Sequence, residues 1–191
     1  MEHSIRLATA RDAQGMLGIY APYVRDTAIS FETEVPALED FSRRIENTYE
    51  KYPWFVYRIC DAIVGYAYAS QHRARSAYRY NVDVSVYVLP EYQGAGVAYT
   101  LYDCLFALLA KLRYINAYAA ITIPNDKSIR FHKKFEFTLI GIHHKTGYKF
   151  GKWHDVAWFE KIINTHEDTP KEVLLTKDIP LEFLESFVSV G

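Results

Sequence analysis

The chain has 191 residues, half of them apolar, and a formal net charge of −1 at pH 7. This length suits one domain with a substantial core, and a second full domain is not expected. The near-neutral charge excludes the strongly basic surface that non-specific nucleic-acid binding requires, so a small molecule is the expected partner.

The first residues have no basic stretch followed by an apolar one, and no apolar run approaches ~20 residues. We therefore expect a cytoplasmic protein with neither an export signal nor a membrane span. Cys60 and Cys104 lie in apolar segments without metal-type spacing. They are expected to be core thiols, and no metal site is predicted.

The first third of the chain predicts a strand, two helices and two further strands, at residues 4–8, 9–24, 38–52, 54–60 and 63–70. The first helix begins with a capping-box sequence at Thr9 to Asp12, whose side chains can satisfy free N–H groups of the first turn. Phe31 lies in a polar loop between the helices, where it can serve as a core plug or as a wall of a substrate pocket. The last two strands are separated by two residues, which is short enough for a hairpin.

The segment at residues 71–81 interleaves basic and aromatic side chains. Its members are His72, Arg73, Arg75, Tyr78, Arg79 and Tyr80. Each arginine alone is most simply a solvated loop residue. As a group beside the next strand, they can hold a substrate carboxylate through paired hydrogen bonds.

A strand, a glycine loop and a helix follow one another between residues 82 and 98, and we expect the function there. Valines alternate with polar residues along the strand, so one face is buried and the other carries Asp83, Ser85 and Tyr87. Gly94 and Gly96 allow positive φ and close approach of a ligand. The N–H groups that open the following helix favour a phosphate or pyrophosphate, and an ordinary loop is the alternative.

The remaining elements are a helix, a strand, a short helix from Asn125 and two strands, at residues 97–112, 115–123, 125–135, 137–144 and 156–161. The first of these helices is apolar nearly all round, so we expect a second subunit or the C-terminal tail to cover it. The order of elements predicts an α/β (α+β) fold with a mixed, largely antiparallel sheet and helices on both faces.

Residues 165–191 are predicted to be an extension of a domain formed by residues 1–164. Thr169 and Pro170 form a helix-start sequence, and Leu181, Leu184 and Val188 fall on one face of a later helical stretch. We expect the extension to be helical and to pack on its own domain or on the partner in a homodimer.

Four motifs occur in the order and spacing of one known family. Ser85 to Val88 precedes Gln93-x-x-Gly96-x-Ala98, Pro124-Asn-Asp126 follows with Ser128 and His132, and residues 147–155 come last. These motifs resemble the GNAT superfamily of N-acetyltransferases. Residues 70–159 are similar to its branch that acetylates phosphinothricin, methionine sulfoximine and methionine sulfone.

The resemblance implies direct transfer of an acetyl group from acetyl-CoA to the α-amino group of a small amino acid or analogue. It implies acetyl-CoA contacts at Val86, Tyr87, Val88, Gln93, Gly94, Ala95, Gly96, Val97, Ala98, Asn125 and Lys134. Arg73 and Arg75 fall where the family meets its substrate. Phe31, Asp83 and Ser85 complete the predicted substrate-binding set.

Asp83 and His132 are the catalytic candidates. An ammonium ion must lose a proton before it can attack a thioester, so the site needs a base. Asp83 falls where most relatives have a catalytic glutamate, and its shorter side chain favours proton abstraction through a bound water. His132 can protonate the departing thiolate, act as the base instead, or serve only as a packed imidazole between two phenylalanines.

Two other functions stay open. A GNAT fold that binds acetyl-CoA as a sensor or scaffold, without turnover, explains the glycine loop equally well. It explains less well the acid at position 83 together with the arginines before it and His132 after it. An acetyltransferase for another amine, such as a polyamine or a protein N-terminus, would favour a long acidic cleft. The sequence instead offers the basic segment at residues 71–81.

Overall fold

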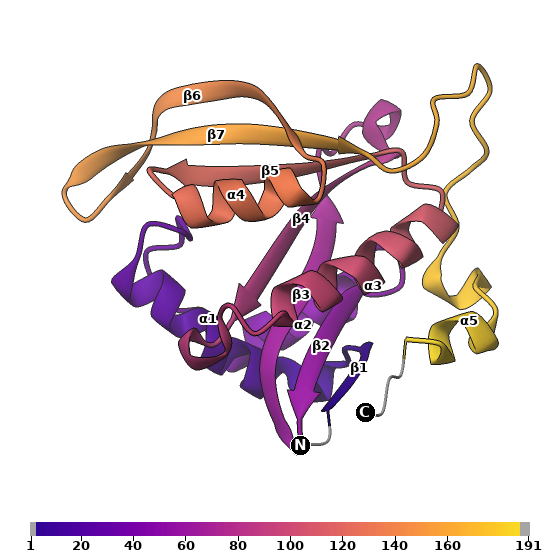
Figure 1. The fold of residues 1–191 in the computed structure, drawn as a ribbon, viewed down its shortest axis with the longest axis horizontal. Helices are drawn as coiled ribbons and strands as arrows, with labels where there is room; N and C mark the ends of the chain where they lie inside the picture. Colours follow the sequence, from indigo (N-terminus) through magenta and orange to yellow (C-terminus); the bar gives the residue numbers. More distant parts are fainter. Residues whose placement is uncertain (1–2, 188–191) are drawn as a thin grey trace.

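A seven-stranded sheet in the order β1-β2-β3-β4-β5-β7-β6 forms the centre of the computed structural model, which describes residues 3–187 (Figure 1). β4 and β5 run parallel, and the other neighbouring strands run antiparallel. The mixed, largely antiparallel sheet predicted from the sequence is confirmed.

The elements follow the predicted order. The strands are β1 (His3–Leu7), β2 (Trp54–Ile59), β3 (Ala62–Gln71), β4 (Asn81–Val88), β5 (Asn116–Ile123), β6 (Thr138–Lys149) and β7 (Lys152–Ile162). The helices are α1 (Ala13–Asp26), α2 (Leu38–Thr48), α3 (Val97–Lys111), α4 (Asp126–Lys134) and α5 (Leu181–Glu185). Short 3-10 turns are η1 (Ala10–Asp12), η2 (Ser76–Tyr78), η3 (Pro90–Tyr92) and η4 (Thr176–Asp178). Within the described range, no helix combines the length and apolar character needed to cross a membrane.

Helices cover both faces of the sheet, as predicted (Figure 1). α1 and α2 bury Met16 and Ile45 on one face, and α3 buries Leu101 and Leu105 on the other. The alternation in β4 decides which side chains meet which layer, because successive residues point to opposite faces. Its valines join the core beneath α3, and its acid and hydroxyls turn to the opposite face.

The predicted capping box is present, but it opens the 3-10 turn η1, and α1 begins only at Ala13. Thr9 and Asp12 form a capping box, in which the Thr9 N–H donates to Asp12 Oδ2 at 2.8 Å. The same carboxylate accepts two hydrogen bonds from the Arg6 guanidinium, each 2.7 Å long. This bidentate pair ties the start of α1 to β1.

β4 and β5 pair only over their first residues. The register joins Asn81–Asp83 to Asn116–Tyr118, although each strand has eight residues. Beyond Asp83 the strands part, as Figure 1 shows. The facing main-chain groups lack a strand partner there, so a ligand that enters the gap can bond to them.

The terminal hairpin is longer than predicted. β6 continues to Lys149 and β7 begins at Lys152, and these two residues form the last pair before the turn. The register shifts between His143 and Gly147. This irregularity interrupts the two-residue alternation, which explains why the sequence pattern did not extend the strands so far.

The C-terminal extension packs on its own domain but is less helical than predicted. Thr169 and Pro170 begin no helix, and residues 170–175 follow an irregular path to η4. The N–H groups of Leu174 and Thr176 donate to the carbonyls of Leu112 and Glu50, at 3.0 and 2.7 Å. These bonds to the domain replace the bonds that a helix would make within itself.

The extension covers the side of α3 that the sequence left without a partner (Figure 1). Ile179 and Phe187 are buried there, and the Phe187 ring lies 5.3 Å from that of Phe55. The prediction that Leu181 lies on the apolar face of this segment is wrong. Leu181 is 66% exposed, and Phe183 and Leu184 pack against the core instead. Val188, also assigned to this face, lies outside the described residues.

The cysteines are less buried than predicted. Cys60 is exposed at the tight turn between β2 and β3, where its φ is 51°. Cys104 is half-buried on α3. The prediction of a core thiol is wrong for Cys60, because the turn of the hairpin leads the chain out of the sheet at this residue.

We expect Ile179→Ala to lower the free energy of unfolding by about 2–5 kcal/mol, because it removes a buried side chain from the contact between extension and domain. Leu181→Ala is the matched control at an exposed position, and its effect should stay within about 0.5 kcal/mol. Chemical denaturation of the full chain measures both. Equal stability of the two variants would show that the burial of Ile179 does not stabilise the fold.

Candidate active site

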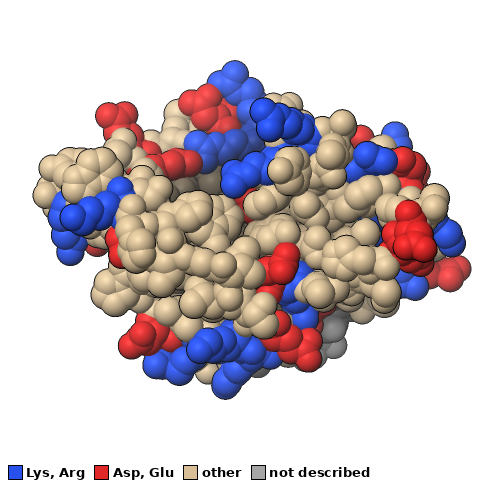
Figure 2. All heavy atoms as spheres, turned by 90° about the horizontal axis from the view of Figure 1, so that it is seen from above, with Lys and Arg blue, Asp and Glu red and all other residues tan. Residues whose placement is uncertain are grey.

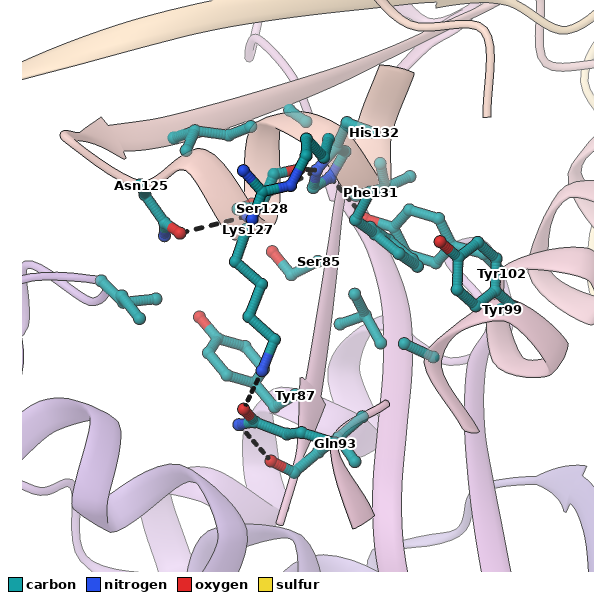
Figure 3. A pocket seen from close by; sticks show the side chains of 18 of the residues that line it. Ser85, Tyr87, Gln93, Tyr99, Tyr102, Asn125, Lys127, Ser128, Phe131 and His132 are labelled. Carbon is teal, nitrogen blue, oxygen red and sulfur yellow. Dashed lines mark hydrogen bonds between the residues drawn. The ribbon is translucent and has the colours of Figure 1, made fainter. Parts of the chain in front are cut away.

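A cavity of about 430 Å³ occupies the gap between β4 and β5. β4, the glycine loop, the start of α3, β5 and α4 all contribute to its wall. Figure 3 shows its labelled residues, which are Ser85, Tyr87, Gln93, Tyr99, Tyr102, Asn125, Lys127, Ser128, Phe131 and His132. The divergence of β4 from β5 thus creates the space for a ligand.

The glycine loop opens α3 toward this cavity. Gly94 and Gly96 have φ values of 88° and 89°, a region that other residues rarely adopt. Gly96 is the N-cap residue of α3, and the N–H groups of the first helical turn have no acceptor within the helix. The open helix start therefore offers donors and a positive dipole end, which suit a phosphate or pyrophosphate.

Most of the residues predicted to contact the cofactor line this cavity. They are Val86, Tyr87, Val88, Gln93, Gly94, Gly96, Ala98, Asn125 and Lys134. Val97 is buried in the core and Ala95 is exposed on the loop, so their side chains do not form the wall. Asn125 caps α4, because its Oδ1 accepts from the Ser128 N–H at 3.1 Å.

Several wall residues were missed by the sequence reasoning, notably Lys127 and Tyr23. Lys127 Nζ donates to Gln93 Oε1 at 2.5 Å (Figure 3). Gln93 Nε2 in turn donates to the Tyr23 hydroxyl at 3.0 Å. These bonds connect α4, the glycine loop and α1 beside the cavity. The sequence around Tyr23 gives no local signal of this role. Lys127 lies within the motif that contains Asn125 and Ser128, and this position is the signal that could have marked it as a site residue.

His132 lies in the wall of the cavity with both ring nitrogens bonded. Nδ1 is 2.9 Å from the main-chain oxygen of Ser128, and Nε2 is 3.1 Å from the Tyr102 hydroxyl. A carbonyl only accepts, so Nδ1 carries the hydrogen and Nε2 accepts from Tyr102. Burial lowers the pKa of His132, which favours the neutral imidazole.

A second cavity of about 290 Å³ adjoins the first. It is lined by Ile29, Phe31, Ala120, Thr122, His143, Thr146, Val156 and Trp158. Ile29 and Ala120 line both cavities, so the two meet beside β5. Phe31, for which the sequence left two roles open, contributes to the wall of this cavity.

Glycine at position 147 makes room for the Phe31 side chain. A Cβ at Gly147 would lie 2.2 Å from the Phe31 ring, closer than real contacts allow. The Phe31 ring also lies 6.1 Å from the ring of His154. The loop before α2 and the terminal hairpin therefore shape this side of the second cavity together.

Asp83 lies on the polar face of β4 and is not among the wall residues of either cavity, but His72 links it to Trp158, which lines the second one. Its Oδ1 is 2.7 Å from His72 Nδ1, and the His72 ring lies 6.1 Å from that of Trp158. Burial raises the pKa of the Asp83 carboxyl, and the His72 hydrogen bond and the charge of Arg73 oppose this in part.

The two predicted arginines have different surroundings. The Arg73 guanidinium lies 6.0 Å from the Trp158 ring and is near enough to Asp83 to favour its charge. Arg75 is exposed at the start of η2 and takes no part in these contacts. The structure thus brings Arg73, but not Arg75, into the group around Asp83.

Charge is mixed on the face that carries β6 and β7. Figure 2 shows Lys, Arg, Asp and Glu interspersed over this face among a larger uncharged surface. The described residues form no long acidic cleft on this face. This distribution differs from the one that a polycationic substrate would favour.

Comparisons with known proteins agree on one family. The family described as Acetyltransferase (GNAT) domain matches residues 5–158. The chain is 37% identical over 164 residues to the phosphinothricin N-acetyltransferase of Streptomyces coelicolor, covering 84% of this chain and 96% of that one. It is 31% identical over 177 residues to the L-methionine sulfoximine/L-methionine sulfone acetyltransferase of Pseudomonas aeruginosa, covering 89% and 100%.

A solved structure shows the same likeness in three dimensions. It is a GNAT superfamily phosphinothricin acetyltransferase from Sinorhizobium meliloti in complex with acetyl-CoA. The two chains superpose with a TM-score of 0.84 at 31% sequence identity, covering 91% of this chain and 96% of that one.

We expect Gly96→Val to weaken the binding of acetyl-CoA by about tenfold or more, because a β-branched residue resists a φ of 89° and the strain falls on the helix start. Isothermal titration measures the affinity. Gly141→Val is the control, since Gly141 has ordinary φ and open space around an added Cβ. Unchanged affinity in a folded Gly96→Val variant would place the ligand elsewhere.

Proposed function

This chain belongs to the GNAT family of acetyltransferase domains, and we propose that it transfers the acetyl group of acetyl-CoA to the α-amino group of a small amino acid or analogue. The relatives named above are acetyltransferases of phosphinothricin, methionine sulfoximine and methionine sulfone. These compounds are the first substrates to test. The observation that carries the proposal is the junction of two cavities. One has an open helix start, and the other has Trp158 in its wall, next to Arg73 and to the His72 that bonds Asp83.

Acetyl-CoA occupies the larger cavity in this proposal. Its pyrophosphate meets the N–H groups from Gly94 to Ala98, and its pantetheine arm follows the unpaired edge of β4 toward Ser85. Lys134 lines the same cavity and supplies positive charge near the phosphates. The free main-chain groups of β4 can bond the amides of the arm and polarise the thioester carbonyl.

The amine reacts from the side of the second cavity. Asp83 takes one proton from the ammonium through a bound water, and the neutral nitrogen then attacks the thioester carbon. A C–N bond forms, and main-chain donors of β4 stabilise the oxyanion. Collapse of this intermediate breaks the C–S bond. A second proton passes from the nitrogen to the sulfur, and the first proton leaves to solvent.

His132 belongs to the leaving-group side in this mechanism. It lines the larger cavity with Tyr102, whereas Asp83 lies on the opposite face of β4. Because the imidazole is neutral and accepts the one hydrogen of the Tyr102 hydroxyl, its proposed role is to hold the Tyr102 side chain in place in the wall on the leaving-group side. The base is therefore assigned to Asp83.

Arg73 is proposed to bind the substrate carboxylate. Its place near Asp83 and Trp158 sets a positive group beside the amine site, which suits an α-amino acid, whose ammonium and carboxylate are attached to the same carbon. Arg75 stays a second candidate from the family resemblance. Ser85 lines the larger cavity next to this group and can donate to the substrate or the thioester.

The homodimer, the cytoplasmic location and the boundary between residues 164 and 165 stay predictions. Leu139, Ile140 and Ile142 are exposed on β6, which is the edge strand of the sheet. An exposed apolar edge strand supports the expectation of a partner. Sedimentation of the purified chain distinguishes a dimer from a monomer.

We expect Asp83→Asn to lower turnover by about 10²–10⁴-fold with acetyl-CoA affinity intact, because the amide keeps the shape but cannot take a proton. The wild-type rate should fall as pH decreases through the raised pKa of Asp83, since only the carboxylate is a base. Release of the CoA thiol measures the rate. Asp61→Asn, at an exposed turn, is the control, and full turnover by Asp83→Asn would reassign the base.

We expect Arg73→Ala to raise the KM for methionine sulfone by about 10–100-fold, because a charge-assisted hydrogen bond to the carboxylate is lost. The effect should disappear with the amide of the same compound, which lacks the carboxylate. Arg75→Ala is the matched comparison. If Arg75→Ala alone raises KM, the carboxylate is held by Arg75 and the assignment to Arg73 is wrong.

A further inference from the structure

His72 lies directly over the proposed base. β3 ends at Gln71, and its antiparallel register with β4 places Ser70 opposite Asp83. The chain then leaves the sheet, and His72 is the first residue beyond the strand. Its Nδ1 reaches Asp83 Oδ1 at 2.7 Å, across eleven positions of sequence.

Aromatic rings hold the imidazole in place. It stacks on Tyr118, with ring centres 4.2 Å apart and planes at 19°, and meets Tyr78 and Trp158 edge-on at 6.2 and 6.1 Å. The Tyr118 hydroxyl donates to Glu160 at 2.8 Å, which anchors the stacking partner itself. The His72 ring therefore has little freedom to turn away from Asp83.

Asp83 is the more accessible member of the pair. Its side chain is 33% exposed, against 11% for that of His72. Of the two Asp83 carboxylate oxygens, only Oδ1 has a hydrogen-bond partner among the described residues. Oδ2 can therefore meet an amine or its bridging water. An imidazole donates from Nδ1–H to a carboxylate in two forms, the neutral tautomer that carries its hydrogen on Nδ1 and the cation.

We propose that His72 is a positioning residue for Asp83: its Nδ1–H holds Oδ1, turns Oδ2 toward the amine and favours the ionised carboxylate before it takes the proton. The inference rests on the proposed role of Asp83 as the base. The Asp83 side chain is short and can reach the amine in few conformations. A fixed donor on Oδ1 therefore preserves the reactive geometry of the carboxylate. The proton still passes to Asp83, and His72 does not become the acceptor.

Other charged and titratable groups surround the pair. They are Arg73 on the same loop, Tyr78 on η2, Tyr118 on β5 and Glu160 on β7 behind Tyr118. Arg73 favours the charged carboxylate, in the same direction as His72. Burial and then Glu160 raise the pKa of Tyr118 to about 12, so its phenol stays neutral where the enzyme works.

The test compares His72→Phe with His72→Asn in the full chain at saturating acetyl-CoA. Phenylalanine keeps a ring against Tyr118 but has no N–H, whereas the amide of asparagine can donate near the former position of Nδ1. We expect His72→Phe to lower kcat/KM by up to about 10²-fold and to move the acidic limb of the pH profile to higher pH. His72→Asn should restore the wild-type limb, and acetyl-CoA affinity should not change in either variant.

The outcomes separate this inference from the proposed function. If both His72 variants keep the wild-type rate and pH profile while Asp83→Asn is inactive, the role of His72 is overturned and Asp83 remains the base. If both lose activity equally and the acidic limb disappears, His72 is itself the base, which also overturns the inference. Full activity of Asp83→Asn overturns the proposed base.

A second His–Asp pair supplies the matched control. His144 Nδ1 lies 3.0 Å from Asp155 on the terminal hairpin, and its side chain is 75% exposed. His144→Phe should leave the pH profile unchanged. Thermal denaturation checks the fold of each variant. Should His72→Phe not fold, His72→Gln replaces it, because its longer amide donates from the Nε2 position and misses Oδ1.

Discussion

The separation of β4 from β5 after Asp83 is the constraint on which the rest of the site depends. A sheet that paired along the full length of these strands would satisfy its own main-chain groups and leave no room between them. Because pairing stops after three residues, one edge of β4 is free to bond a ligand. The open start of α3 stands at the far end of the same gap.

β4 serves the core and the chemistry at once because its side chains alternate. Its valines pack beneath α3, so the strand is held firmly by apolar contacts. Asp83 and Ser85 project from the opposite side without disturbing that packing. A half-buried carboxylate is costly unless other groups favour its charge, and His72 and Arg73 both do so here.

The C-terminal extension is linked to this chemistry through the loop before β4. Arg79 donates to Glu172 at 3.2 Å, and the Tyr80 hydroxyl donates to the carbonyl of Pro170 at 3.3 Å. The extension is in turn anchored by Ile179 and Phe187 in the core. The segment that carries His72 and Arg73 is thus bound at its far end to a buried part of the fold.

The sequence by itself determined the order of the elements, the buried face of β4 and the glycine-opened start of α3, since each follows from residues close together in the chain. It also placed Asp83 on the polar face. The tertiary structure alone decided that His72 meets Asp83, that Lys127 reaches Gln93 and that Arg73 lies over Trp158, a wall residue of the second cavity. These contacts depend on strand register, on the path of loops and on how far β5 diverges from β4. Local periodicity specifies none of these, because each is settled by packing among segments distant in the chain.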